Sequence, residues 1–120
     1  MPRNISFALT TPQFLDDTKD VTRRLGWLDL EDGDELMAVE KAQGLKKGEK
    51  VNRLGRIRVH PRREMLDRMT ADEAYGREEC RREGFPQMSP AEFVAFFCRT
   101  HKGCTPGTVI TRIEYERLPL

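Results

Sequence analysis

The chain has 120 residues, of which 38% are hydrophobic and 34% are charged, and its formal net charge is +1. This length predicts a single domain over residues 1–120, because two separate cores would need a longer chain. No apolar run approaches the length of a membrane span, and residues 1–13 lack the apolar stretch of a secretion signal. We therefore expect a cytoplasmic protein without a membrane partner, whose three cysteines are free thiols.

The first forty residues predict two strands, a short helix and a loop. Residues 5–9 alternate apolar and small side chains, which is typical of a strand. Residues 11–15 begin with threonine and proline, which indicate a short helix with the threonine hydroxyl as its cap. Residues 28–34 have the acidic, glycine-containing composition of a loop, and residues 35–40 predict a mostly buried strand.

The remaining strands are predicted from alternating side chains. Glycines and lysines in residues 44–48 predict a polar hairpin or loop. Residues 52–60 alternate with a shift of register near Gly55, and Pro61 either ends this strand or marks a sheet edge. Residues 108–118 alternate most clearly and predict the last strand.

Two helices are predicted between these strands. Thr70 and Glu73 form a potential capping box, and Ser89 with Pro90 and Glu92 forms a stronger one. The second helix carries apolar side chains three or four residues apart, which share one face that we expect in the core: Phe93, Phe96 and Phe97.

These elements together predict an α+β domain. Four or five strands with short helices inserted between them favour a small, mostly antiparallel sheet. A partly closed β-barrel is an economical way to bury such a sheet in a short chain. The sequence shows no internal repeats.

Charged residues are arranged in blocks. Residues 1–40 hold 4 Lys/Arg and 9 Asp/Glu, whereas residues 41–63 hold 9 Lys/Arg and a single acid, Glu49. Residues 64–93 are acidic again, with 4 basic and 8 acidic side chains. The central basic block fits either a phosphate-binding surface or a solvated hairpin.

The stretch TKDVTRR at residues 18–24 brings a lysine, a threonine and two arginines together. In an extended segment alternate residues share a face, so Thr22 and Arg24 point away from their apolar neighbours. Lys19 lies at the preceding turn and can reach back toward Thr22. A threonine hydroxyl needs a base to become a nucleophile, and burial or a nearby arginine must lower the pKa of a lysine that serves as one. A polar strand edge is the alternative.

The order of several short motifs resembles the ASCH domain family. These motifs are Lys19-x-x-Thr22-x-Arg24, then Gly33-Asp34, then Glu83-Gly84-Phe85. The resemblance covers most of the chain, from residue 5 to about residue 116, and implies a PUA-like β-barrel fold with a cleft that binds RNA or nucleosides. Some small bacterial members are amidohydrolases that deacetylate acetylcytidine, and other members are described as ribonucleases.

The resemblance also implies roles for four residues. Lys19 would be the base, Thr22 the nucleophile and Glu83 the proton carrier. Arg24 matches the motif arginine, which can anchor a phosphate or polarise a carbonyl. The basic block is longer than a free nucleoside requires, and this departure from the small amidohydrolases favours RNA or another single-stranded nucleic acid as the partner.

Other residues complete the predicted binding surface. Trp27, the only tryptophan, either stacks on a base or packs at the rim of the core. The remaining substrate-binding candidates are basic: Arg23, Lys41, Lys46 and Lys47.

Cys98, His101 and Cys104 form a C-x-x-H-x-x-C pattern, with Cys80 as a possible fourth ligand. Structural zinc sites usually have closer pairs of ligands, so packed thiols and a histidine at a helix end are the favoured interpretation, and zinc stays open as an alternative. We expect no metal and no cofactor.

The sequence therefore predicts an RNA- or modified-nucleoside-binding domain whose cleft is lined by the Lys-x-x-Thr-x-Arg motif. The alternatives are an amidohydrolase acting on acetylcytidine, a ribonuclease using the same cleft, and a protein-interaction module. Whether the cleft catalyses a reaction or only binds is left open, as is the oligomeric state.

Overall fold

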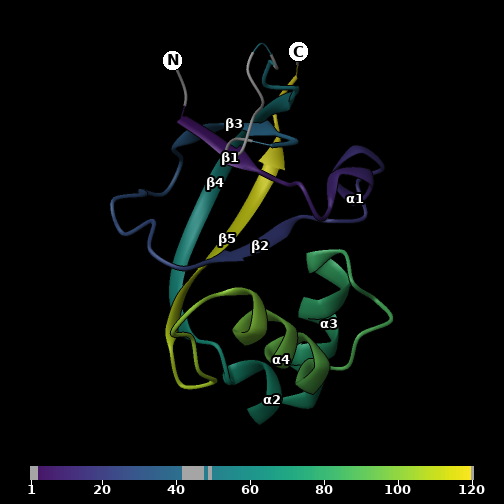
Figure 1. The fold of residues 1–120 in the computed structure, drawn as a ribbon, viewed down its shortest axis with the longest axis vertical. Coiled ribbons are helices and arrows are strands. Elements are labelled where there is room, and N and C mark those ends of the chain that lie inside the picture. The colour runs from purple at the N-terminus through teal and green to yellow at the C-terminus, as the bar shows by residue number, and fades with distance from the viewer. Residues whose placement is uncertain (1–2, 42–47, 49, 120) are drawn as a thin grey trace.

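The computed structural model describes residues 3–41, 48 and 50–119 of the chain. Five strands and four helices lie within these residues. In chain order they are β1 (Arg3–Ser6), α1 (Thr11–Leu15), β2 (Val21–Arg24), β3 (Glu35–Val39), β4 (Arg53–Met65), α2 (Arg68–Ala71), α3 (Glu73–Glu83), α4 (Pro90–Thr100) and β5 (Val109–Arg117). Figure 1 shows α2, α3 and α4 gathered at one end of the long strands β4 and β5, with β1 and β3 at the other end. The prediction of an α+β protein is confirmed.

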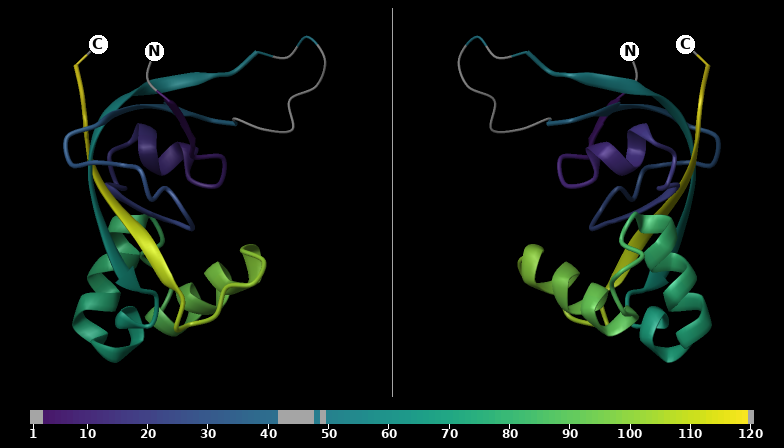
Figure 2. Two further views of the ribbon diagram at one scale, coloured as in Figure 1. Left: turned by 90° about the vertical axis from the view of Figure 1, so that its left-hand side faces the viewer. Right: turned by 90° about the vertical axis from the view of Figure 1, so that its right-hand side faces the viewer.

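The strands form one sheet in the order β1-β3-β4-β5-β2. Pairing is parallel between β1 and β3 and antiparallel between the other neighbours. The sheet curls into a half-barrel (Figure 2), in which β1 and β2 are the two edge strands. The predicted partly closed barrel is thus present as a half-barrel. It is mixed rather than wholly antiparallel, and no backbone pairing joins β1 to β2 among the described residues.

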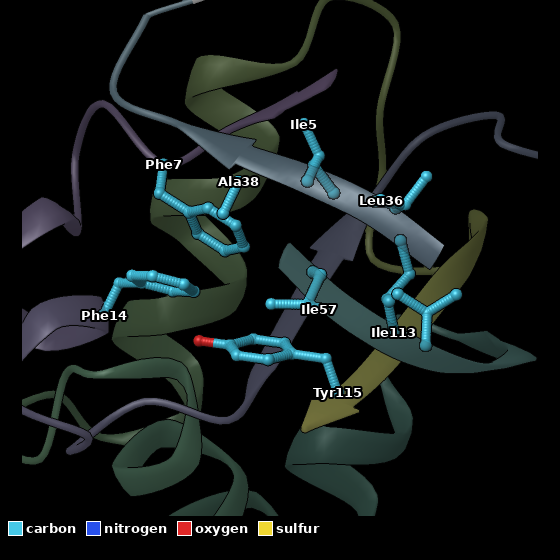
Figure 3. Packing of buried hydrophobic residues seen from close by; sticks show 9 residues of the cluster. Ile5, Phe7, Phe14, Leu36, Ala38, Ile57, Ile113 and Tyr115 are labelled. Atoms are coloured by element: carbon cyan, nitrogen blue, oxygen red, sulfur yellow. The ribbon is translucent and has the colours of Figure 1, made fainter. Parts of the chain in front are cut away.

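Two hydrophobic clusters fill the molecule. One lies inside the curled sheet, where the rings of Phe7 and Phe14 stack at 5.1 Å between centroids and Tyr115 packs beside both (Figure 3). The other lies among the helices and includes Met69 and Phe97. The helices are thus held to the sheet end by a core of their own.

Several local predictions are confirmed. The register of β3 and β4 shifts between Ala38 and Val39, opposite Gly55, whose φ is 150°. Pro61 lies beyond the last residue of β4 that pairs with β3, so it marks a free sheet edge and the strand continues. Ser89 caps α4 through the predicted capping box with Glu92.

Other local predictions are wrong. The first strand ends at Ser6. The residue before α1 is Thr10, while the Thr11 hydroxyl donates to the Phe7 carbonyl instead of capping the helix. Thr70 likewise donates to a carbonyl, and Asp72 is the residue that caps α3. In both places the threonine hydroxyl donates to a backbone carbonyl three or four residues earlier. Sequence spacing alone cannot distinguish this hydrogen bond from a helix cap.

The loop at residues 28–34 is confirmed, and its Gly33-Asp34 pair bonds to the backbone of Val59 in β4. Of the predicted hairpin at residues 44–48, only Gly48 belongs to the described residues. None of the helices in the described ranges is long and apolar enough to cross a membrane.

Candidate functional site

A cavity of about 210 Å³ lies where the open edge of the half-barrel faces α4. Its walls come from the segment after β1, from β2 and the turn before it, from the end of α3 and from α4. All four residues implied by the resemblance line it: Lys19, Thr22, Arg24 and Glu83. Residues that the motif places in one cleft therefore do come together around one cavity.

Lys19 is almost completely buried, at 3% exposure. Its Nζ donates three hydrogen bonds, to the Val21 carbonyl at 2.7 Å, the Glu83 carbonyl at 2.8 Å and Glu83 Oε1 at 3.2 Å. Burial lowers the pKa of Lys19 below its usual value, although the charge of Glu83 opposes that shift. Three acceptors match the three N–H bonds of an ammonium, and none of them is the Thr22 hydroxyl.

Thr22 is paired with Arg24 instead. Arg24 Nε donates to Thr22 Oγ1 at 3.2 Å, as expected for two residues on one face of β2. Arg24 Nη2 donates to the Ser6 carbonyl at the end of β1. The guanidinium therefore bridges the two edge strands of the half-barrel beside the cavity, and Nη1 has no hydrogen-bond partner in the described part of the chain.

Glu83 is placed by the way α3 ends. Gly84 follows it with φ of 94°, a left-handed conformation that suits glycine at a helix C-terminus. A Cβ at Gly84 would also lie 3.0 Å from the Gln13 side chain of α1. The Glu-Gly-Phe motif thus lets the chain turn closely past α1 and leaves the Glu83 carboxylate facing Lys19.

Arg23 lies at the centre of a buried network of charges. Its Nη atoms donate to Glu83 Oε2 at 3.0 Å, to Glu64 Oε2 at 3.2 Å and to Glu79 Oε1. Arg112 Nη2 donates to Glu79 Oε2 at 3.0 Å and extends the network to β5. Burial would lower the pKa of Arg23, but the charges of Glu83 and Glu79 outweigh it and raise that pKa. Arg23 Nε is buried without a partner.

These contacts define what Arg23 does. Its side chain is fully buried, at 0% exposure, and both Nη atoms already bond to carboxylates. It borders the cavity, but its donors hold Glu83 in place rather than point to a free acceptor. Arg24 Nη1 also has no hydrogen-bond partner among the described residues and, unlike Arg23 Nε, it is not fully buried, so Arg24 is the arginine with an accessible donor left for a ligand.

The opposite wall of the cavity is aromatic and comes mainly from α4. Phe93 and Phe97 are buried as predicted, whereas Phe96 and Phe85 are half-buried; all four line the cavity. His101 lines it as well and stacks on Phe97, with 3.9 Å between ring centroids and 11° between planes. The phenylalanine spacing predicted that this face of α4 lies in the core. The same face is also a cavity wall, because α4 lies across the cavity from β2.

The other predicted contacts lie elsewhere. Trp27 packs at the rim of the sheet core, where Arg3 Cζ lies 3.9 Å from its ring centroid, and it does not line the cavity. Lys41 is exposed just after β3 and is also outside the cavity lining. Lys46 and Lys47 fall outside the described residues.

Part of the basic block is paired with acids from β3, from the loop before it and from β4 itself. Arg56 and Arg58 both bond to Glu35 across the β3–β4 pair, at 3.1 and 3.5 Å. His60 Nδ1 lies 2.7 Å from Asp32, and Arg62 Nη2 lies 2.9 Å from Glu64. The excess of basic residues in the sequence is therefore reduced where β4 meets its neighbours.

The C-x-x-H-x-x-C residues are only partly grouped. Cys98 and Cys104 Sγ are 3.9 Å apart, but His101 Nδ1 faces the Phe97 carbonyl at 2.9 Å. Cys80 is buried in the helical core, and this burial raises the pKa of its thiol to about 11. Within residues 3–41, 48 and 50–119, no group of three or more His, Cys, Asp or Glu side chains is placed to hold a metal ion.

Chemically, the cavity has one polar side with a hydroxyl, an ammonium, a guanidinium and a carboxylate, and one aromatic side ending in an imidazole. Sequence reasoning did not assign the aromatic wall, including Phe85, Phe96 and His101, or the segment after β1 to the site. The signals for the aromatic wall were the Glu-Gly-Phe motif, the helical phenylalanine stripe and the C-x-x-H-x-x-C pattern. Comparison of the chain with family models, with curated proteins and with solved structures gives no match.

Proposed function

We propose that the cavity binds a modified nucleoside or a single unpaired base of an RNA, in an ASCH-like domain with a PUA-like fold. The observation that carries this proposal is the composition of the cavity. Planar rings stack on aromatic side chains, and the polar side offers donors for ring carbonyls. The half-barrel and the meeting of the motif residues at one cavity support the family assignment.

The size of the cavity favours one ring over a longer segment. Its volume of about 210 Å³ is below the roughly 300–1,000 Å³ of pockets that enclose a drug-sized ligand. A base with its substituent fits such a space, with the sugar and any phosphates at the mouth. The ion pairs along β4 also reduce the charge available to a long phosphate backbone.

Calorimetric titration with cytidine and acetylcytidine tests the binding proposal. We expect one site per chain, and Arg24→Gln should weaken binding by about tenfold or more, because it removes a charge-assisted hydrogen bond. Arg58→Gln is the matched control, since that arginine is exposed and bonded to Glu35. No heat with either ligand, or equal losses in the two variants, would refute the proposal.

Amide hydrolysis is the second candidate, because Lys19, Thr22 and Glu83 all border the cavity. Thr22 Oγ1 would attack the acyl carbon, its proton would pass to Lys19, and Glu83 would protonate the departing amine. Water would then hydrolyse the acyl-threonine. Lys19 can accept a proton only after losing one, and Glu83 Oε1 at 3.2 Å is the nearest carboxylate to take it.

Release of cytidine from acetylcytidine, followed by chromatography, tests hydrolysis separately from binding. Thr22→Ser should retain turnover because it keeps the hydroxyl, and Thr22→Val should abolish it while leaving the shape of the side chain almost unchanged. If Thr22→Val still releases cytidine at the wild-type rate, threonine is not the nucleophile. Binding without release by the wild type leaves the domain as a binding module.

A further inference from the structure

His101 ends α4 and turns its ring back onto that helix. It is the C-cap residue, and its Nδ1 lies 2.9 Å from the Phe97 carbonyl and 3.1 Å from Thr100 Oγ1. A carbonyl oxygen only accepts, so Nδ1 must carry the proton of this hydrogen bond. The side chain thereby satisfies one of the carbonyls that a helix C-terminus leaves without an intrahelical partner.

This bond decides which nitrogen of His101 is left for a ligand. Because Nδ1 carries a proton it cannot accept from the Thr100 hydroxyl, whose one proton has the carbonyls of Phe96 and Phe97 as acceptors at 3.0 and 3.2 Å. With the proton on Nδ1, a neutral imidazole has its acceptor lone pair on Nε2. Nε2 has no hydrogen-bond partner in the described ranges, and His101 is half-buried in the cavity wall.

The rest of α4 holds the ring in this place. Stacking on Phe97, at 3.9 Å and 11°, fixes the plane of the imidazole, and Phe97 itself is buried in the helical core. The other aromatic side chains of this wall have no acceptor to offer. The Thr100 hydroxyl also lines the cavity but bonds to the backbone of α4, so His101 Nε2 is the polar atom that this wall leaves without a partner among the described residues.

We propose that His101 determines specificity, with Nε2 accepting a hydrogen bond from an exocyclic N–H of the bound ring. The ligand class is an aminopyrimidine or its N-acyl derivative, whose carbonyl oxygen faces Arg24 and whose amine edge faces α4. This inference rests on the proposed function and adds the group that selects among rings. A ring whose exocyclic nitrogen carries no hydrogen leaves Nε2 unpaired in a partly buried wall, which costs affinity.

The test compares two ligands on two proteins by calorimetry. Cytidine has an exocyclic N–H, and N4,N4-dimethylcytidine has none. Wild type should bind cytidine about tenfold more tightly, the effect of roughly one hydrogen bond to a buried acceptor. His101→Phe keeps a ring to stack on Phe97 but has no acceptor, so its preference should fall to about twofold or less.

The controls separate steric and folding effects from hydrogen bonding. Phe also presents a ring edge to the two methyl groups, so a preference that persists unchanged in His101→Phe is steric and overturns the inference. His101→Gln returns an acceptor and should recover part of the preference, with circular dichroism confirming that both variants are folded. Wild type that binds both ligands equally also overturns it, while wild type that binds neither refutes the proposed function itself.

Discussion

Two groups of ion pairs in this protein use the same residue types in opposite environments. One group, which we call the buried network, joins β2, α3, β4 and β5 and consists of Arg23, Glu64, Glu79, Glu83, Arg112 and Lys19. The other, the β3–β4 surface pairs, links Arg56 and Arg58 to Glu35. Arg23 is 0% exposed and Arg56 is 48% exposed. Pairs of an arginine with a glutamate therefore occur in both a buried and an exposed environment, and their contributions to stability differ.

Solvent explains the difference. Water screens an exposed pair and replaces either partner, so such pairs contribute about 0–1 kcal/mol. A buried charge has lost its hydration and depends on its partner, so removing one member leaves the other uncompensated. In this protein the buried network also includes Glu83, which lines the cavity. Folding stability and the position of a proposed site residue therefore depend on the same contacts.

The largest expected effect comes from Arg23→Met. It removes the cation between three carboxylates while keeping a long apolar side chain, and we expect the free energy of unfolding to fall by about 3–5 kcal/mol. Urea denaturation followed by circular dichroism measures it. Arg56→Met is the matched control from the surface pairs and should cost less than about 1 kcal/mol. Similar losses in the two variants would show that burial does not separate the two groups.

Acid should weaken the buried network through Glu79. Burial alone would raise its pKa, but the hydrogen bond from Arg112 and the charge of Arg23 lower it from 4.5 to about 2. The folded-state pKa is the lower one, so the stabilisation is complete above pH 4.5 and is lost as the pH falls toward 2.

Unfolding free energies measured from pH 7 to pH 2 test this behaviour. The wild type should lose stability across that window, and Glu79→Gln should be less stable at pH 7 but flatter below pH 4.5. Glu35→Gln, from the surface pairs, should follow the wild-type curve. A Glu79→Gln curve parallel to wild type would place the acid sensitivity in other carboxylates.

Local signals in the sequence predicted the elements that depend on nearby residues. The Ser89–Glu92 capping box, the shift at Gly55 and the shared face of Thr22 and Arg24 are all confirmed, because each acts over at most a few residues or one strand pairing. The predicted cap at Thr11 is wrong, because its hydroxyl donates to the Phe7 carbonyl at 2.8 Å and no side chain among the described residues caps α1.

The partners of the site could not be predicted in the same way. Arg23 is 60 residues from Glu83 and 56 from Glu79 along the chain, and no periodicity encodes such a pairing. Both adjacent arginines were predicted to bind the substrate, whereas β2 directs Arg24 to Thr22 and Arg23 to the carboxylates. Strand alternation alone places the two arginines on opposite faces, but which face meets the carboxylates depends on the packing of α3 against β2.

A smaller effect is expected when the surface pairs are broken together. The double variant Arg56→Met with Arg58→Met should lower the free energy of unfolding by about 1 kcal/mol or less, since both side chains are exposed and share Glu35, and the further contact of Arg58 with Glu116 is 3.9 Å long. Raising the salt concentration from 0.1 to 1 M shortens the screening length to about 3 Å and should remove most of this difference. A loss that persists in high salt would indicate that the arginine stems, rather than their charges, stabilise β4.

The smallest expected effect concerns His60, and it requires a titration rather than an unfolding experiment. The hydrogen bond to Asp32 raises the pKa of His60 above its usual 6.5, with a further contribution from Glu116. The folded-state pKa is the higher one, so any stabilisation is complete below pH 6.5 and is lost as the pH rises from 6.5 through the higher folded-state pKa. Asp32→Asn should lower the pKa of His60 in an NMR titration and leave the resonances of His101, the other histidine, unchanged. If the pKa of His60 does not move, water replaces Asp32 at no cost in free energy. An exposed ion pair can approach that limit, whereas a buried pair cannot, because water does not reach it.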